Sequence, residues 1–205
     1  MILDIHSHRE APYPEGIISL RKFDLPLCEG QLYSAGIHPW DTAEIDVEQE
    51  IKLLEGILTM PEIVAVGECG VDPGKGAPMF RQLQILKKQI ELSETFGKPL
   101  ILHCVKSSDV IMGLKRDLKP SQPWIIHGFR GKPALGAQLT DKGIYLSFGE
   151  KFNPDTVAAM PGEMMFAETD ESALSIQEII AALSHASGED ITSRIESNVR
   201  RIFKF

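Results

Sequence analysis

The sequence lacks any apolar run near the roughly 18 residues that a membrane-spanning helix needs. Its first residues also lack the basic segment followed by an apolar segment that is typical of a secretory signal. Cysteine is scarce: the three present, Cys28, Cys69 and Cys104, are an odd number and show no paired spacing. These absences predict no membrane span and a cytoplasmic protein whose thiols stay reduced.

Basic residues are in the minority, since 21 lysines and arginines face 29 aspartates and glutamates and the net charge is −8. This balance argues against broad, non-specific nucleic-acid binding, which needs a basic surface. It leaves room for a small positive site on an acidic protein. The 205 residues also lack internal repeats, low-complexity tracts and linker-like stretches, so we expect one domain over residues 1–205 with no obligate protein partner.

What the chain does contain is an alternation of short apolar runs with longer amphipathic segments. Eight runs are predicted to be strands: residues 2–6, 17–20, 32–37, 63–68, 99–103, 124–127, 144–148 and 165–168. Eight strands separated by helices predict an α/β protein with a TIM-like (β/α)8 barrel. The competing open, doubly wound sheet usually begins with a glycine-rich turn, which this sequence lacks. The segment between His8 and residue 16 is too short for a helical crossover, so we expect a compact barrel with a reduced first βα unit.

Side chains of the kind that bind metals follow these predicted strands. His6 and His8 share one face of the first strand, because side chains alternate along a strand, and such a pair can chelate one cation. The same kinds of side chain recur at the ends of later strands: His38, Glu68, His103, His127 and Asp170. Strand ends of a barrel meet on one rim, so we expect these side chains to lie together. A mixture of imidazoles and carboxylates favours zinc, manganese or iron over calcium.

Each of these residues alone has an ordinary structural interpretation. His103 and His127 could be core histidines with satisfied hydrogen bonds, and Glu68 could be a buried, hydrogen-bonded acid. Asp170 could cap the helix that follows it, and Asp4 could orient the nearby histidines or be a paired core acid. We favour the shared metal site because the ordinary interpretations would require many coincidences on one rim.

Seven short motifs in this order also match a known family. They are DIHSH at 4–8, AGIHPWD at 35–41, VAVGECGVD at 64–72, PLILHC at 99–104, IHGFRG at 126–131, GIYLS at 143–147 and ETD at 168–170. On these motifs the chain resembles the TatD-type metal-dependent deoxyribonucleases of the amidohydrolase-like barrels. It departs from the family pattern at Val105 and at residues 171–173, on the wall that faces substrate.

The resemblance implies a site for two divalent metal ions, which would be zinc, manganese or magnesium. The first ion would be held by His6, His8, Glu68 and Asp170, and the second by Glu68, His103 and His127. Two cations can activate a water molecule and offset the charge on a phosphoryl oxygen. Glu68, as the bridging ligand, and Asp170, as the acceptor of the water's proton, are the predicted catalytic residues.

The predicted substrate is DNA or a short oligonucleotide, contacted by His38, Lys106 and Arg130. Further positive charge near the rim comes from Arg9, Lys75 and Lys132 and would suit a phosphate group, although loops often carry charge without such a role. Two alternatives stay open at this point. The same metals would serve an amidohydrolase or a deacylase acting on a small molecule or an aminoacyl-tRNA, and a metal-binding scaffold without turnover is the third hypothesis.

Overall fold

The computed structural model describes residues 1–23 and 25–204, and its strands form a closed barrel in the order β1 to β8. Each strand pairs in parallel with the next, and β8 pairs with β1. The strands are β1 Asp4–Ser7, β2 Gly16–Leu20, β3 Leu32–Ala35, β4 Ile63–Val71, β5 Leu100–Cys104, β6 Trp124–Ile126, β7 Ile144–Phe148 and β8 Met165–Ala167. All eight predicted strands are present, so the predicted TIM-like barrel is confirmed.

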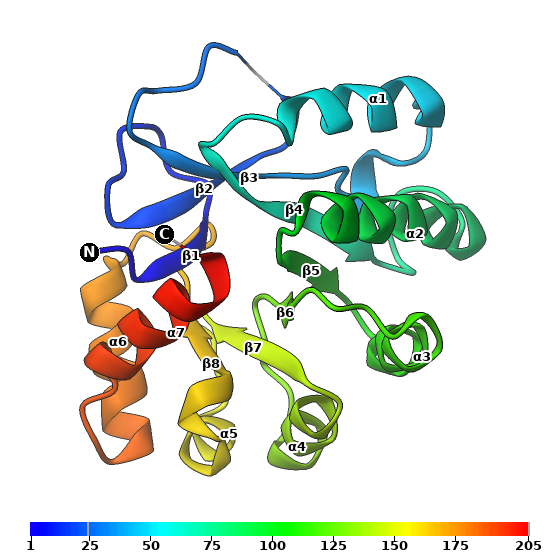
Figure 1. Ribbon diagram of the computed structural model, residues 1–205. Helices are drawn as coiled ribbons and strands as arrows, with labels where there is room; N and C mark the ends of the chain where they lie inside the picture. Colours follow the sequence, from blue (N-terminus) through cyan, green and yellow to red (C-terminus); the bar gives the residue numbers. More distant parts are fainter. Residues whose placement is uncertain (24, 205) are drawn as a thin grey trace.

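The helices surround the strands and leave the outside of β1 and β2 to loops (Figure 1). They are η1 Pro39–Asp41, α1 Val47–Ile57, α2 Met79–Phe96, α3 Ser108–Leu118, α4 Pro133–Asp141, α5 Pro154–Ala159, η2 Gly162–Met164, α6 Ile176–Ser187 and α7 Thr192–Phe203. The described residues between β1 and β2 form no helix, as the short connection predicts. The described part of the β2–β3 connection is also non-helical, and this second reduced unit was not predicted.

β4 is longer than the predicted strand and continues three residues past Glu68. The pairing of β4 with β5 shifts register between Val66 and Cys69. Gly70 has a φ of 142°, and a side chain there would place its Cβ 2.0 Å from the carbonyl oxygen of His103. Glycine therefore allows the close approach of β4 and β5, and Glu68 lies within the strand rather than at its end.

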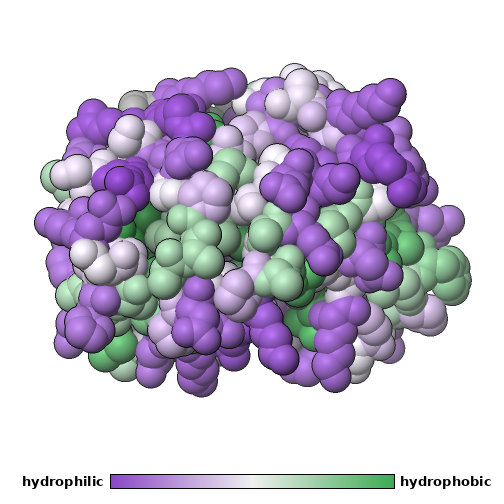
Figure 2. Space-filling model, turned by 90° about the horizontal axis from the view of Figure 1, so that it is seen from below, coloured by the Kyte–Doolittle hydropathy of each residue, from purple (hydrophilic) through white to green (hydrophobic). Residues whose placement is uncertain are grey.

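Fully buried side chains from the strands fill the barrel and the layer beneath the helices, among them Trp124, Phe148 and Phe166. Hydrophilic residues cover most of the face in Figure 2, and apolar residues appear in smaller areas between them. Across the two described ranges, every helix is too short or too polar to cross a membrane. The core thus holds the strand ends in fixed positions, and the polar site is built on them.

Candidate metal centre

Glu68 lies at the centre of a cluster of histidines and is almost fully buried. Its carboxylate faces five imidazoles that come from the ends of β1, β3, β5 and β6. Oε1 lies 2.6 Å from His103 Nδ1, 2.8 Å from His127 Nε2 and 3.0 Å from His38 Nε2, and Oε2 lies 3.3 Å from His6 Nε2 and 3.5 Å from His8 Nε2. Five of the six histidines of the protein therefore share one carboxylate.

Asp170 joins the cluster from the other side of the β1–β8 seam. Its Oδ1 lies 3.8 Å from His6 Nε2 and 3.6 Å from His8 Nε2. Backbone hydrogen bonds hold it there, because its N–H donates to the carbonyl of His6 and its own carbonyl accepts from His8. The helix-cap interpretation of Asp170 is wrong: α6 begins at Ile176, and its capping residue is Ser175.

Charge inside the cluster is strongly coupled. Burial raises the pKa of Glu68, but the neighbouring His127 and His6 outweigh it and hold that pKa far below the usual range. Burial lowers the pKa of His127, but the carboxylates of Glu68 and Glu168 raise it well above 6.5. The two carboxylates thus favour the protonated form of His127 in the metal-free protein, and binding of a cation would release that proton.

The residues present fit a divalent cation. Three overlapping sets each bring their ligand atoms within 4.8 Å of one another: His6, His8 and Glu68; His6, His127 and Asp170; and His38, Glu68 and His103. In the described ranges, both ring nitrogens of His6 and Nε2 of His103 are buried without a hydrogen-bond partner. Unpaired buried polar atoms are costly, and a bound cation would remove part of that cost. Imidazole and carboxylate together match the ligand preference of zinc or manganese.

Two carboxylates to which the sequence analysis gave no role face the ring nitrogens of His127 and His103 that point away from Glu68. Oε1 of the fully buried Glu168 accepts a 2.6 Å hydrogen bond from the Gly128 N–H and lies 3.3 Å from His127 Nδ1. Oδ2 of Asp72 lies 3.8 Å from His103 Nε2 and accepts a hydrogen bond from Trp40. Their presence in the motifs at 168–170 and 64–72 was the signal that could have identified them.

Asp4 does not contact the histidine rings through its carboxylate. It accepts hydrogen bonds from the Thr169 N–H and hydroxyl, from the His6 N–H and from the Tyr13 hydroxyl. Burial raises the pKa of Asp4 to about 7, although the Thr169 and His6 hydrogen bonds oppose the rise. Asp4 is thus a paired core acid that ties β1 to the segment after β8.

The three residues predicted to contact substrate lie in three different parts of the site and its surroundings. His38 lies in the cluster itself, with Nε2 against Glu68. Arg130 lines a cavity of about 210 Å³ that also includes Asp170 and Lys151. Lys106 is exposed on the loop after β5.

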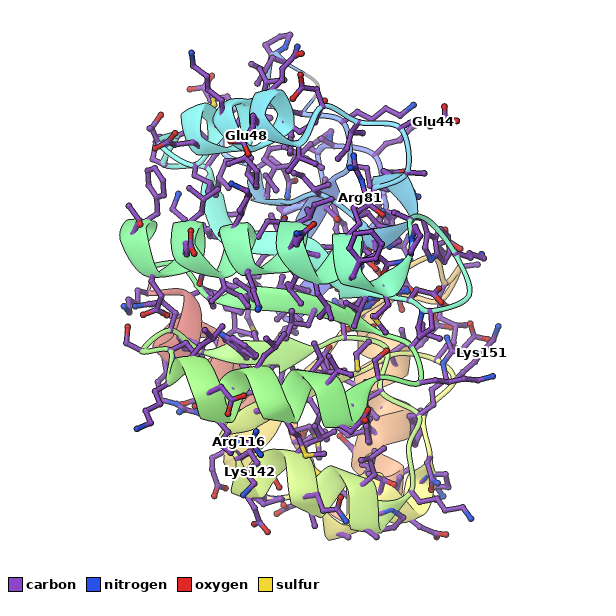
Figure 3. The ribbon with its side chains drawn as sticks, turned by 90° about the vertical axis from the view of Figure 1, so that its right-hand side faces the viewer. Glu44, Glu48, Arg81, Arg116, Lys142 and Lys151 are labelled. Atoms are coloured by element: carbon purple, nitrogen blue, oxygen red, sulfur yellow. The ribbon has the colours of Figure 1, made fainter. Side chains whose placement is uncertain are left out.

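Of the other predicted rim cations, Arg9 has a structural role. Its guanidinium donates hydrogen bonds to the carbonyls of Ser172 and Leu174 and so holds the loop after β8. Figure 3 shows Lys151 on the side where the loops follow the strands, whereas Arg116 and Lys142 lie toward the opposite end. Lys151, which the sequence analysis did not single out, therefore lies on the same side as the cluster.

A family model and individual known proteins both match this chain. The family model described as TatD related DNase matches residues 28–204. An uncharacterized metal-dependent hydrolase, YabD of Bacillus subtilis, is 26% identical over 199 residues, covering 84% of this chain and 78% of the relative. A protein named 3'-5' ssDNA/RNA exonuclease TatD from Shigella flexneri is 22% identical, covering 83% of this chain and 76% of the relative.

Solved structures share the fold. The crystal structure of YjjV, a TatD homolog from Escherichia coli K12, superposes with a TM-score of 0.83 at 17% identity, covering 100% of this chain and 98% of that one. A TatD family hydrolase from Entamoeba histolytica superposes with a TM-score of 0.74 at 15% identity, covering 98% and 97%. At these identities the superpositions support the barrel rather than a particular substrate.

Proposed function

This chain belongs to the TatD family of metal-dependent hydrolases, and from that membership we propose that it hydrolyses phosphodiester bonds of DNA or short oligonucleotides. The observation that carries the proposal is the convergence of five histidines and Asp170 around the buried Glu68. The TatD name of the Shigella relative makes single-stranded nucleic acid the first substrate class to test.

We propose two divalent cations, either zinc, manganese or magnesium, at this cluster. His6, His8, Glu68 and Asp170 would hold one, and Glu68, His103 and His127 would hold the other. Divalent cations in such a site lower the pKa of water and offset the negative charge of a phosphoryl oxygen.

Asp170 is the proposed proton acceptor. Its side chain is 31% exposed and lines the cavity, whereas that of Glu68 is 4% exposed. Water can therefore approach the Asp170 carboxylate and give up its proton to it, and the buried Glu68 serves to orient the histidines.

Arg130 and Lys151 are the proposed contacts for the substrate phosphate. Both line the cavity that contains Asp170. The same cavity is lined by the carboxylates of Glu150, Glu168, Asp170 and Glu171, so the guanidinium and the ammonium offer local contacts to a phosphate rather than a broad positive surface. Such a local site suits one or a few phosphates better than a long duplex, which needs an extended basic surface.

A substrate panel tests the proposal. Single-stranded and duplex oligonucleotides, a phosphomonoester, an amide and an aminoacyl ester would each be assayed with magnesium, manganese and zinc. We expect chelator-sensitive hydrolysis of the oligonucleotides. Selective hydrolysis of the amide or the aminoacyl ester would instead favour the amidohydrolase or deacylase alternative.

A pair of variants ties the activity to the cluster. Glu68→Ala should lower kcat by at least about 10³-fold, because the shared carboxylate is lost. Glu44→Ala is the matched control, since Glu44 is exposed and lies outside the cluster. Full activity of Glu68→Ala in a correctly folded protein would overturn the proposed metal site.

A further inference from the structure

Trp40 is an exposed aromatic side chain beside the metal cluster. It lies in η1 after β3, and its exposed fraction is 36%, whereas Trp124, the other tryptophan of the chain, is fully buried. The indole lies 4.8 Å from the His38 ring and 5.5 Å from the His103 ring, between ring centroids. Any molecule bound against the open part of this indole would therefore also border the cluster.

The indole is held in place rather than free to rotate. Its Nε1–H donates a 2.8 Å hydrogen bond to Asp72 Oδ2, and the backbone N–H of Trp40 donates to His38 Nδ1. Both partners are themselves buried. A ring that is already ordered loses little conformational entropy when a flat ligand stacks on it.

Two cations lie against the same ring. Lys75 Nζ is 3.5 Å from the ring centroid, and Arg21 Cζ is 5.7 Å from it. The Arg21 guanidinium is held by the carboxylate of Asp41, whereas Lys75 sits on an exposed loop. A fixed aromatic face with adjacent cations is the combination that binds a nucleobase together with its phosphate.

We infer that Trp40, Lys75 and Arg21 form a subsite that stacks one nucleobase of a single-stranded substrate and contacts the adjoining phosphate. The base lies on the indole, and the Lys75 ammonium moves from the ring to the phosphate. This inference rests on the proposed function and adds the substrate class, a strand with an intact base beside the scissile phosphate. The subsite lies over β3 and β4, across the barrel from the Arg130 and Lys151 wall.

The test compares two substrates of equal length and charge, a single-stranded oligothymidylate and an abasic oligonucleotide, with the metal-loaded protein. We expect the wild type to show a KM roughly tenfold lower for the oligothymidylate, in line with the stacking of one base. Trp40→Leu should remove this preference, because it lacks a π face. Trp40→Phe should keep most of it, because a ring remains.

Trp40→Phe also separates stacking from a positioning role, since it removes the hydrogen bond to Asp72. Equal damage from Trp40→Phe and Trp40→Leu, on both substrates alike, would show that the indole only positions Asp72 and would overturn the subsite. Phe80→Leu is the control, because Phe80 is a 67% exposed aromatic on α2. The oligothymidylate should also quench the fluorescence of the wild type more than that of Trp40→Phe, in which only the buried Trp124 remains.

The outcomes separate this inference from the proposed function. Hydrolysis of both oligonucleotides with equal KM, unchanged by Trp40→Leu, would overturn the subsite and leave the phosphodiesterase proposal standing. Hydrolysis of neither would overturn both. A tenfold preference that Trp40→Leu abolishes and Trp40→Phe retains would establish the subsite.

Discussion

Glu168 offers the sharpest test of how the cluster is held together. It is fully buried, and its Oε1 accepts a hydrogen bond from the Gly128 N–H and also lies against His127 Nδ1. A carboxylate behind a metal-binding imidazole fixes the ring orientation and the protonated nitrogen, which leaves Nε2 free for the metal. We therefore predict that Glu168→Ala lowers the affinity of the protein for a divalent metal.

The expected loss follows from the contacts. Removing such a supporting carboxylate typically costs 10- to 100-fold in metal affinity, or about 1.4 to 2.7 kcal/mol. Glu168→Ala also leaves the Gly128 N–H without its 2.6 Å acceptor, which should lower the free energy of unfolding by about 1–3 kcal/mol. Glu168→Gln keeps an oxygen for the same N–H and for His127 Nδ1, so its effects should be smaller.

Calorimetric titration of the chelator-treated protein with manganese or zinc measures the affinity directly, without reference to any substrate. Glu163→Gln is the control, because Glu163 is an exposed carboxylate outside the histidine cluster. Thermal unfolding of each metal-free variant measures the stability term separately. Wild-type metal affinity in a folded Glu168→Ala variant would refute the reasoning.

Three other predictions concern stability. Glu68→Gln removes the charge that several buried histidines face, so urea unfolding of the metal-free protein near pH 6 should show a loss of about 3–5 kcal/mol. The raised pKa of His127 contributes stability that is complete below about pH 6.5 and disappears as the pH rises through that pKa. The His127 contribution to the free energy of unfolding of the metal-free protein should therefore fall with pH above about 6.5, by up to about 1.4 kcal/mol per pH unit; a flat urea-unfolding profile there would contradict this. Asn198→Ala removes two 2.8 Å hydrogen bonds from α7 to the carbonyls of Gly162 and Met165, and it should cost about 1–3 kcal/mol while leaving metal affinity unchanged, as urea unfolding and calorimetric titration would show.

The sequence predicts the barrel well because its strands are short apolar runs with clear boundaries. It predicts the positions of the metal-type residues for the same reason, since all of them except Glu68 lie between one residue before and three residues after the last residue of a strand. Glu68 is the exception. Its place inside β4 depends on the close approach allowed by Gly70 and on the shifted register with β5, and neither is visible in a local pattern.

The supporting contacts could not be predicted from spacing. Glu168 meets Gly128 across a sequence separation of 40 residues, and Trp40 meets Asp72 across 32. Such pairs follow from the register of the strands around the barrel, which is settled only when the barrel closes. The use of Arg9 to hold the loop after β8 has the same origin, because its two acceptors lie more than 160 residues away.

The closing seam of the barrel has a consequence for synthesis of the chain. β1 emerges from the ribosome first and β8 last, yet their pairing is what brings Asp170 to His6 and His8. A nascent chain thus carries His6 and His8 before the aspartate that faces them has been made. The Asp170 carboxylate can join the two histidines only after β8 has been synthesised and has paired with β1, so assembly of this part of the cluster waits for closure of the barrel.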